Sequence, residues 1–143
     1  MSVEETESTI RGYLDALLSA GDFASFFSDD IVWTTMETGE RVQGRDAVKG
    51  FINALHNELF DAAPEVVNLT FTDGVAGLEA VFVGTHTAEF AGVPATGSPV
   101  RLPYSVFYDV ADGAIPAVRA YFPMSALVQQ LAGAASAPGQ PTR

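Results

Sequence analysis

Apolar residues recur with helical spacing in two segments of the N-terminal half. Positions i, i+3, i+4 and i+7 lie on one face of a helix, so each stripe predicts an amphipathic helix. The first predicted helix ends at Gly21, and the second runs from Arg45 to Phe60 and stops before Pro64. The stripes comprise Ile10, Tyr13, Leu14, Leu17 and Leu18 in the first helix and Val48, Phe51, Ile52, Leu55 and Leu59 in the second.

Strands are predicted where apolar and polar residues alternate and where β-branched and aromatic residues gather. The segments 78–90 and 100–110 alternate most clearly, with mostly apolar side chains at even-numbered positions. That face is therefore expected to be buried. Asp73-Gly74 and Asp112-Gly113 are turn sequences that fit connections between neighbouring strands. The predicted strands are 31–35, 65–72, 78–90, 100–110 and 115–122.

The order of these elements predicts a single α+β domain. Helices come first and a run of antiparallel strands follows, so we expect a curved antiparallel sheet wrapped around the N-terminal helices. A short helix is also expected within residues 22–27, and another begins at Ser125 and ends at Leu131. The domain is expected to span residues 1–132, and residues 133–143 have the composition of a disordered tail.

Charge and composition argue against several classes of partner. The chain has 143 residues, with 7 basic and 18 acidic side chains and a net charge of −11. Such a surface repels phosphate backbones and anionic lipid headgroups, so we expect neither nucleic acid nor a membrane as partner. With no cysteine and 2 histidines, we expect no metal site. The missing cysteine and the acidic start, Met1 to Glu5, favour a cytoplasmic protein over a secreted one.

The chain has more apolar residues than a small monomer needs for its own core, because they make up 48% while charged residues make up 17%. The excess is expected to line a cavity or a subunit interface. The odd-numbered sheet face fits a homodimer interface, or else an open solvated surface whose ion pairs contribute little. Cross-strand ion pairs and apolar area are expected there from Arg101, Arg119, Glu79 and Glu89 with Val81, Val83, Phe107 and Tyr121.

His86 is the most informative polar residue, because strand alternation places it on the apolar face beside Gly84 and Ala88. Burying an imidazole costs free energy unless hydrogen bonds compensate. Two interpretations stay open. His86 is either a structural histidine that a neighbouring strand or Tyr104 satisfies, or an acid, base or hydrogen-bond donor in a pocket.

Aromatic residues that carry a hydroxyl or an indole N–H group are also predicted to face the core. Tyr104 and Tyr108 are in phase with Val106, so a buried hydroxyl there needs a partner. A tyrosine that faces a cavity can stabilise charge developing on a carbonyl or enolate oxygen, and ordinary core packing is the alternative. Trp33 and Thr35 are in phase on strand 31–35, where the indole is expected to form either core or the wall of a cavity.

One longer stretch resembles a known family. Residues 84–97 read Gly-Thr-His-Thr-Ala-Glu-Phe-Ala-Gly-Val-Pro-Ala-Thr-Gly, and Asp112-Gly113-Ala114-Ile115, Arg119-Ala120-Tyr121-Phe122-Pro123 and a segment from Leu127 to Leu131 follow. Together they resemble the SnoaL-like polyketide cyclases, which share a superfamily with nuclear transport factor two, ketosteroid isomerase and limonene epoxide hydrolase. The resemblance covers about residues 3–132. It implies a cone-shaped, barrel-like fold around an apolar pocket, a dimer, and ring closure on polyketides without a cofactor.

The resemblance also implies roles for individual positions. Where cyclases and epoxide hydrolases carry an acid/base aspartate, this chain has Ala120. The base of ketosteroid isomerase falls near Thr35, and a polar residue of the first strand falls near Trp33 and Thr35. Tyr104 takes the place of a pocket amide and Val106 that of a pocket histidine. The usual proton-transfer carboxylate is therefore missing.

We expect a cofactor-independent cyclase that closes a ring on a hydrophobic polyketide-type intermediate in natural-product, antibiotic-type biosynthesis. Confinement in a pocket can supply roughly 7–11 kcal/mol without a titrating group, which favours a cycloaddition-type closure helped by hydrogen bonds from His86 or Tyr104. The alternatives are an aldol-type closure with His86 as base, an epoxide hydrolase or isomerase using Glu89, Asp30 or Glu37, and a non-catalytic carrier. Expected substrate-binding residues are Trp33, Thr35, Tyr13, Phe51, Leu55, Phe82, Phe90, Val106, Tyr108, Ala120 and Phe122.

Overall fold

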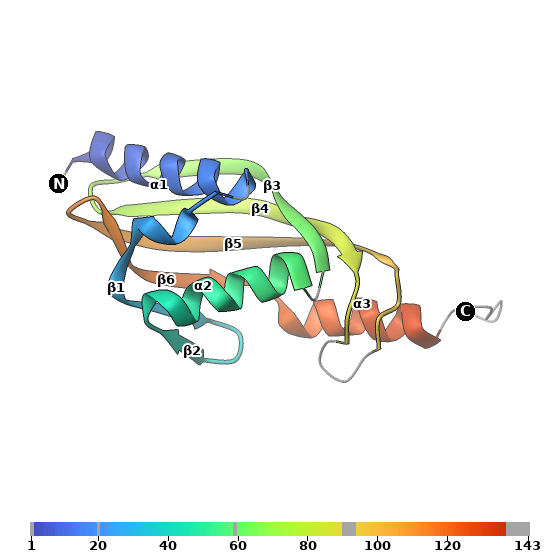
Figure 1. Ribbon diagram of the computed structural model, residues 1–143. Coiled ribbons are helices and arrows are strands. Elements are labelled where there is room, and N and C mark those ends of the chain that lie inside the picture. Colours follow the sequence, from blue (N-terminus) through green and yellow to red (C-terminus); the bar gives the residue numbers. More distant parts are fainter. Residues whose placement is uncertain (1, 20, 59, 90–93, 137–143) are drawn as a thin grey trace.

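Three α-helices and a six-stranded sheet form the part of the chain that the computed structural model describes, residues 2–19, 21–58, 60–89 and 94–136 (Figure 1). The sheet curves around α1 and α2, which lie over one of its faces. The elements are α1 (Val3–Leu18), η1 (Phe23–Phe26), β1 (Phe27–Thr35), β2 (Glu40–Gln43), α2 (Arg45–Asn53), η2 (Ala54–Glu58), β3 (Phe60–Phe71), β4 (Val75–His86), β5 (Pro99–Ala111), β6 (Ala114–Tyr121) and α3 (Met124–Ser136).

The first predicted helix is confirmed as α1. It begins after Ser2, whose side chain accepts a hydrogen bond from the backbone N–H of Glu5 at 3.1 Å and so caps the helix. The acidic first turn also suits the positive end of the helix dipole. The stripe that predicted the helix packs on the sheet, with Ile10, Tyr13 and Leu14 buried. After the helix, the N–H of Gly21 reaches the carbonyl of Ala16 at 2.7 Å.

The second predicted helix is shorter than its apolar stripe indicated. The α-helix α2 ends at Asn53, a single π-helical turn (η2) follows, and β3 begins at Phe60. Pro64 therefore lies inside a strand instead of stopping a helix. A proline is tolerated there because β3 is at the edge of the sheet, where not every N–H needs a partner strand.

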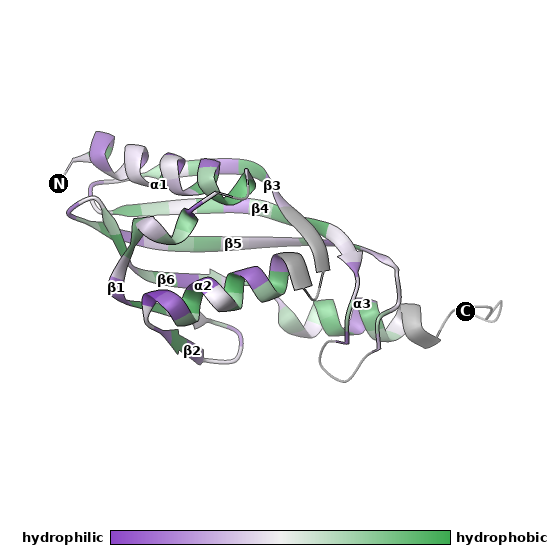
Figure 2. Cartoon of the chain, viewed as in Figure 1, coloured by the Kyte–Doolittle hydropathy of each residue, from purple (hydrophilic) through white to green (hydrophobic). Residues whose placement is uncertain are grey.

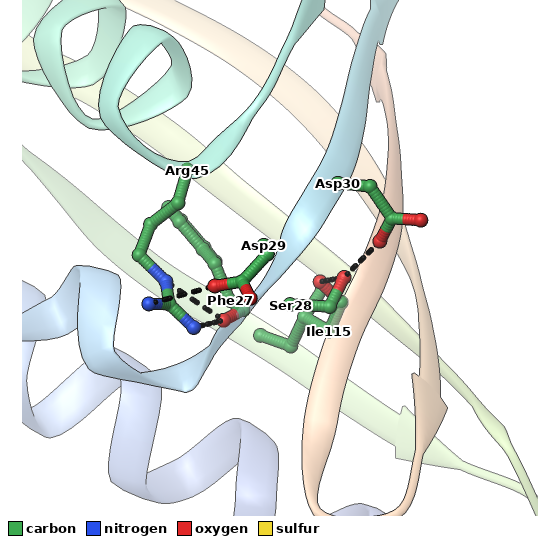
Figure 3. A network of polar contacts seen from close by, with 6 residues as sticks. All are labelled: Phe27, Ser28, Asp29, Asp30, Arg45 and Ile115. Atoms are coloured by element: carbon green, nitrogen blue, oxygen red, sulfur yellow. Dashed lines mark hydrogen bonds and ion pairs between the residues drawn. The ribbon is translucent and has the colours of Figure 1, made fainter.

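Arg45 fastens the start of α2 to β1. Its Nε and Nη2 atoms donate hydrogen bonds to the carbonyl of Phe27 at 3.1 and 2.8 Å, and Nη1 pairs with the Asp29 carboxylate at 3.0 Å (Figure 3). Beside this contact, the hydroxyl of Ser28 lies 3.4 Å from the carbonyl oxygen of Ile115 and so connects β1 with β6. The helix α2 is thus anchored to β1 at its first residue.

The sheet is mixed and open. Its strand order is β2-β1-β6-β5-β4-β3, and β1 runs parallel to β6, with Thr35 beside Ala120. The predicted α+β class is confirmed, whereas the fully antiparallel sheet is wrong for this one pair. The long connection through α2 and four strands allows a parallel neighbour, which a hairpin does not. The sheet does not close into a barrel, because β2 and β3 are its two edges.

The predicted alternation is confirmed on the long strands. Even-numbered residues such as Leu78, Phe82 and Val106 are buried, while odd-numbered Glu79 and Phe107 are exposed. Figure 2 shows the hydrophobic residues along the strands and on α3, with hydrophilic residues at the first turns of α1 and α2. The strand predicted over 78–90 ends earlier, at His86, and Phe90 lies outside the described residues.

The final helix extends further than predicted. It begins at Met124, one residue before the expected Ser125, and continues to Ser136, past the expected end at Leu131. Residues 137–143 lie outside the described part. Leu127 and Leu131 are fully buried and hold α3 against the domain. Across the described segments, no helix is both long enough and apolar enough to cross a membrane.

Candidate binding pocket

A cavity of about 30 Å³ lies between the buried sheet face, α1 and the end of α2. That volume holds about two water molecules, which need roughly 10–15 Å³ each. Its walls are almost entirely apolar or aromatic. The helices contribute Tyr13, Leu14, Leu17, Ile52, Leu55 and His56, and the sheet side contributes Trp33, Pro64, Leu78, Phe82, Tyr104, Val106, Tyr108, Ala120 and Phe122.

Most residues expected to bind substrate line this cavity. Thr35 and Phe51 do not: Thr35 is buried and accepts a hydrogen bond from the Trp33 indole, and the ring of Phe51 packs 5.4 Å from the Trp33 ring. Both therefore support Trp33 from outside the cavity. The expected residues that do form the wall are Trp33, Tyr13, Leu55, Phe82, Tyr104, Val106, Tyr108, Ala120 and Phe122.

His86 is not among the described residues of the cavity wall. It is fully buried at the end of β4, where its Nδ1 atom accepts a hydrogen bond from the backbone N–H of Thr96 at 3.2 Å and lies 3.1 Å from the Thr96 hydroxyl. The backbone of His86 also bonds Gly97 and Ser98, each at 3.0 Å. These contacts tie the segment before β5 to the end of β4, so the geometry favours the structural interpretation of His86.

His56 lines the cavity, and the sequence analysis did not identify it. It lies in η2, with its ring centroid 5.8 Å from that of Phe82 and the planes at 32°. Burial lowers the pKa of His56 to about 4, so the ring is neutral near pH 7 and has one unprotonated nitrogen. No described residue forms a hydrogen bond with this ring. The sequence did contain one indication of this role. His56 comes four residues after Ile52, so it continues the apolar face of the helix that was predicted from Arg45 to Phe60.

Three tyrosines bring hydroxyl groups to the same cavity. The rings of Tyr13 and Tyr108 are 5.7 Å apart, and the rings of Tyr104 and Phe122 are 5.2 Å apart. Burial raises the pKa of all three phenols, and the charge of neighbouring phenols adds to this for Tyr13 and Tyr108. They therefore stay protonated and act as donors. Their hydroxyls form no hydrogen bond with any described residue, which leaves them available to a ligand.

No carboxylate, ammonium or guanidinium group is among the described residues of the wall. Asp30, Glu37 and Glu89, which an epoxide-opening enzyme would have to turn inward, are all exposed. Glu37 instead binds the start of α3, where its carboxylate accepts hydrogen bonds from the N–H and hydroxyl of Ser125. Within the described segments, no group of three potential metal ligands gathers. Near neutral pH, the described part of the wall therefore carries no formal charge.

Ala120, which the resemblance places where related enzymes carry an acid/base aspartate, is a small buried residue of β6. It is 1% exposed and pairs with Val106 on one side and Thr35 on the other. Its methyl group forms part of the cavity wall. An alanine side chain has no group that can transfer a proton.

The outer sheet face carries ion pairs, with partners that differ from those expected. Arg119 bonds Asp109 through two nitrogens at 3.1 and 3.0 Å, and Arg101 lies 3.4 Å from Glu65. The expected partners Glu79 and Glu89 are not in these pairs. Sheet register explains the difference, because Asp109 lies diagonally across from Arg119 on the neighbouring strand.

Comparisons with known proteins agree with this geometry. The family model of the SnoaL-like polyketide cyclases matches residues 9–131. A polyketide cyclase candidate from Xanthomonas campestris has a TM-score of 0.79 at 24% identity, over 90% of this chain and 98% of its own. A SnoaL-like candidate from Jannaschia has a TM-score of 0.79 at 22% identity, over 94% of each chain.

A ketosteroid isomerase candidate from Kribbella flavida is more distant, with a TM-score of 0.67 at 24% identity, over 85% of this chain and 79% of its own. No curated protein matches the chain. At these identities the solved structures show the fold, whereas the family model covers most of the sequence. The chain belongs to the SnoaL-like polyketide cyclase family.

Proposed function

We propose that this chain is a cofactor-independent cyclase that binds a hydrophobic polyketide-type intermediate in the cavity and closes a ring on it. The observation that carries the proposal is an apolar wall combined with three protonated tyrosine hydroxyls that no described residue engages. Such donors hold a carbonyl oxygen and stabilise negative charge that develops on it. Membership of the cyclase family supports the same reaction class.

The cavity has to widen for such a substrate, because about 30 Å³ is far less than a ring system occupies. Four residues of the wall are partly exposed, namely Leu17, Trp33, His56 and Tyr104. We place the substrate entrance among them. Rotation of these side chains enlarges the cavity at its surface end while the buried sheet residues stay in place.

In this proposal, confinement of the substrate in the cavity supplies most of the rate enhancement. Holding two reacting parts of one chain together can supply roughly 7–11 kcal/mol. Tyr104 is the half-buried donor beside Phe122, so it meets a carbonyl that enters from the surface end. A cycloaddition needs only this folding of the substrate, whereas an aldol-type closure also needs a base.

A non-catalytic carrier is the second candidate, and Ala120 is the observation that favours it. A wall without a carboxylate can bind a hydrophobic ligand and leave it unchanged. Product analysis separates the two candidates. A carrier returns the linear compound intact, while a cyclase releases a product with one more ring.

The lone tryptophan gives a direct binding test. Trp33 fluorescence is followed while cyclohexanone, 2-tetralone, anthrone and a linear polyene are added in turn. Saturation at one ligand per chain supports the proposal, and the largest ligand that saturates measures how far the cavity opens. Tyr121→Phe, on the outer face, is the matched control for Tyr104→Phe. A flat response to every compound contradicts a ligand-binding cavity beside Trp33.

We also propose that the outer sheet face forms a homodimer and that the protein works in the cytoplasm. Phe107 and Tyr121 are 40% and 46% exposed and pack edge to face with ring centroids 6.0 Å apart. A second copy of the chain would cover this apolar area. The absence of cysteine fits a reducing compartment.

A further inference from the structure

We propose that His56 is the base of the cavity and accepts a proton from the bound substrate. This inference rests on the proposed binding function and adds a proton-transfer step to it. The step removes a proton from the carbon next to a substrate carbonyl. It was not expected from the sequence, where His86 was the candidate base.

The first argument is the composition of the wall. Among its described residues, His56 is the one side chain with a nitrogen lone pair that can take a proton. The tyrosines are protonated donors, and the other wall residues are apolar apart from the indole of Trp33, which is a donor. A proton that leaves carbon inside this cavity therefore has His56 as its acceptor.

The second argument is position. His56 packs against Phe82, Phe82 packs against Phe122 at 5.3 Å, and Phe122 packs against Tyr104 at 5.2 Å. These contacts and the lining place the His56 ring and the Tyr104 hydroxyl on the wall of one cavity. A ligand in that cavity meets both a base and a hydroxyl donor, which are the two groups that enolate formation needs.

The third argument concerns the strength of the base. Burial keeps His56 neutral at pH 7, with a pKa of about 4. An ordinary aspartate has a pKa of about 3.9, so the half-buried imidazole is a base of similar strength to an ordinary carboxylate. The charge differs, because protonated His56 is a cation beside an anionic enolate. In an apolar cavity these opposite charges attract strongly.

The step balances without a co-reactant. The unprotonated nitrogen of His56 takes the proton, and the electron pair of the broken C–H bond moves into the enolate, whose oxygen accepts a hydrogen bond from Tyr104. The enolate carbon then attacks a second carbonyl of the same chain and forms the new C–C bond. The resulting alkoxide takes the proton back from the imidazolium, so His56 is neutral again.

The test uses the whole protein and 2-tetralone as a probe, because this ketone has exchangeable protons next to its carbonyl. Proton NMR follows their replacement by deuterium in D₂O, and Trp33 fluorescence follows binding. General base catalysis typically contributes about 10²–10⁴-fold, so we expect His56→Gln to lower the protein-catalysed exchange rate about 100-fold or more. His56→Phe keeps the ring packing against Phe82 and is expected to show the same loss. Lys49→Gln, on the exposed face of α2, is the control and is expected to exchange as the wild type does.

A second-site rescue makes the test specific. Ala120→Asp puts a carboxylate into the same cavity, and we expect it to restore part of the exchange in the His56→Gln background. Full exchange in both His56 variants would overturn the inference. Saturable binding without any exchange in the wild type would overturn it too while leaving the binding proposal intact. Absence of binding would overturn both.

Discussion

The indole nitrogen of Trp33 donates a hydrogen bond to the hydroxyl oxygen of Thr35, 3.3 Å away on the same strand. Thr35 is 4% exposed, so this contact fixes the indole from behind the cavity wall. Phe51 packs against the same indole from α2. The orientation of Trp33 is therefore set by two residues that do not themselves line the cavity.

Thr35→Val tests this support. Valine keeps the shape of threonine but removes the acceptor, so the indole N–H loses its partner at a cost of about 1 kcal/mol. We expect a lower free energy of unfolding in urea and a shifted Trp33 emission maximum. An unchanged emission spectrum would contradict the hydrogen bond, and Thr34→Val on the opposite strand face is the control.

Tyr104→Phe removes the hydroxyl that we assign to the substrate carbonyl. One hydrogen bond is worth about 0.5–1.5 kcal/mol, so the dissociation constant of 2-tetralone is expected to rise about 2- to 13-fold. The Trp33 titration measures it. The hydrocarbon analogue of 2-tetralone lacks the carbonyl group that Tyr104 would contact. It should therefore bind the wild type and Tyr104→Phe with equal affinity. Equal affinities for the ketone would remove Tyr104 from the proposed role.

His56 makes stability depend on pH. Its pKa is about 4 in the folded protein against an ordinary 6.5, so between these values the unfolded chain binds more protons. Stability is therefore complete above about pH 6.5 and falls as the pH drops toward 4. From pH 7 to 4.5, we expect the wild type to lose about 1–3 kcal/mol more than His56→Gln in urea unfolding. Equal losses in the two proteins would show that His56 is not desolvated.

Glu37 holds the start of α3 in a different pH range. Hydrogen bonds from Ser125, first from its hydroxyl and then from its N–H, lower the pKa of the Glu37 carboxyl below its ordinary value. Its contribution is present above pH 4.5 and is lost as the pH falls through the lowered value. We expect Glu37→Gln to speed amide exchange at Ser125 at pH 7, measured by NMR. Exchange as slow as in the wild type would contradict the cap, and Glu40→Gln is the control.

The proposed homodimer interface on the outer sheet face predicts that a charge placed there changes the oligomeric state. Phe107→Lys puts a charge into the apolar area that Phe107 and Tyr121 form. We expect the wild type to sediment as a dimer and this variant as a monomer, with unchanged circular dichroism. Lys49→Glu, on the helix side, should leave the mass unaltered. A monomeric wild type at micromolar concentration would contradict the proposed interface.

Local patterns predicted the elements well because each depends on a short stretch of chain. Strand alternation placed Phe82, Tyr104 and Val106 on one buried face, and the helix stripe placed Tyr13 and Leu55 opposite them. These two periodicities account for most of the cavity wall. The family motifs added the class of reaction.

The features that the sequence did not reveal depend on distant contacts. His56 reaches the cavity because η2 brings it to Phe82 of β4, and the His86 ring contacts Thr96, which lies ten residues later in the chain. The parallel pairing of β1 with β6 likewise joins residues far apart in the chain. The helix end predicted from Pro64 was wrong because a proline can end a helix but is also tolerated in an edge strand.

A crystal structure of the protein with 2-tetralone tests the central claim most directly, namely that the cavity binds a carbonyl compound between a base and a hydroxyl donor. We predict that the rings lie in the widened cavity beside Trp33 and Phe122. The carbonyl oxygen should lie within hydrogen-bond distance of Tyr104, with the adjacent carbon facing His56. Binding to the outer face at Phe107 and Tyr121, with the cavity still closed at about 30 Å³, would contradict the account.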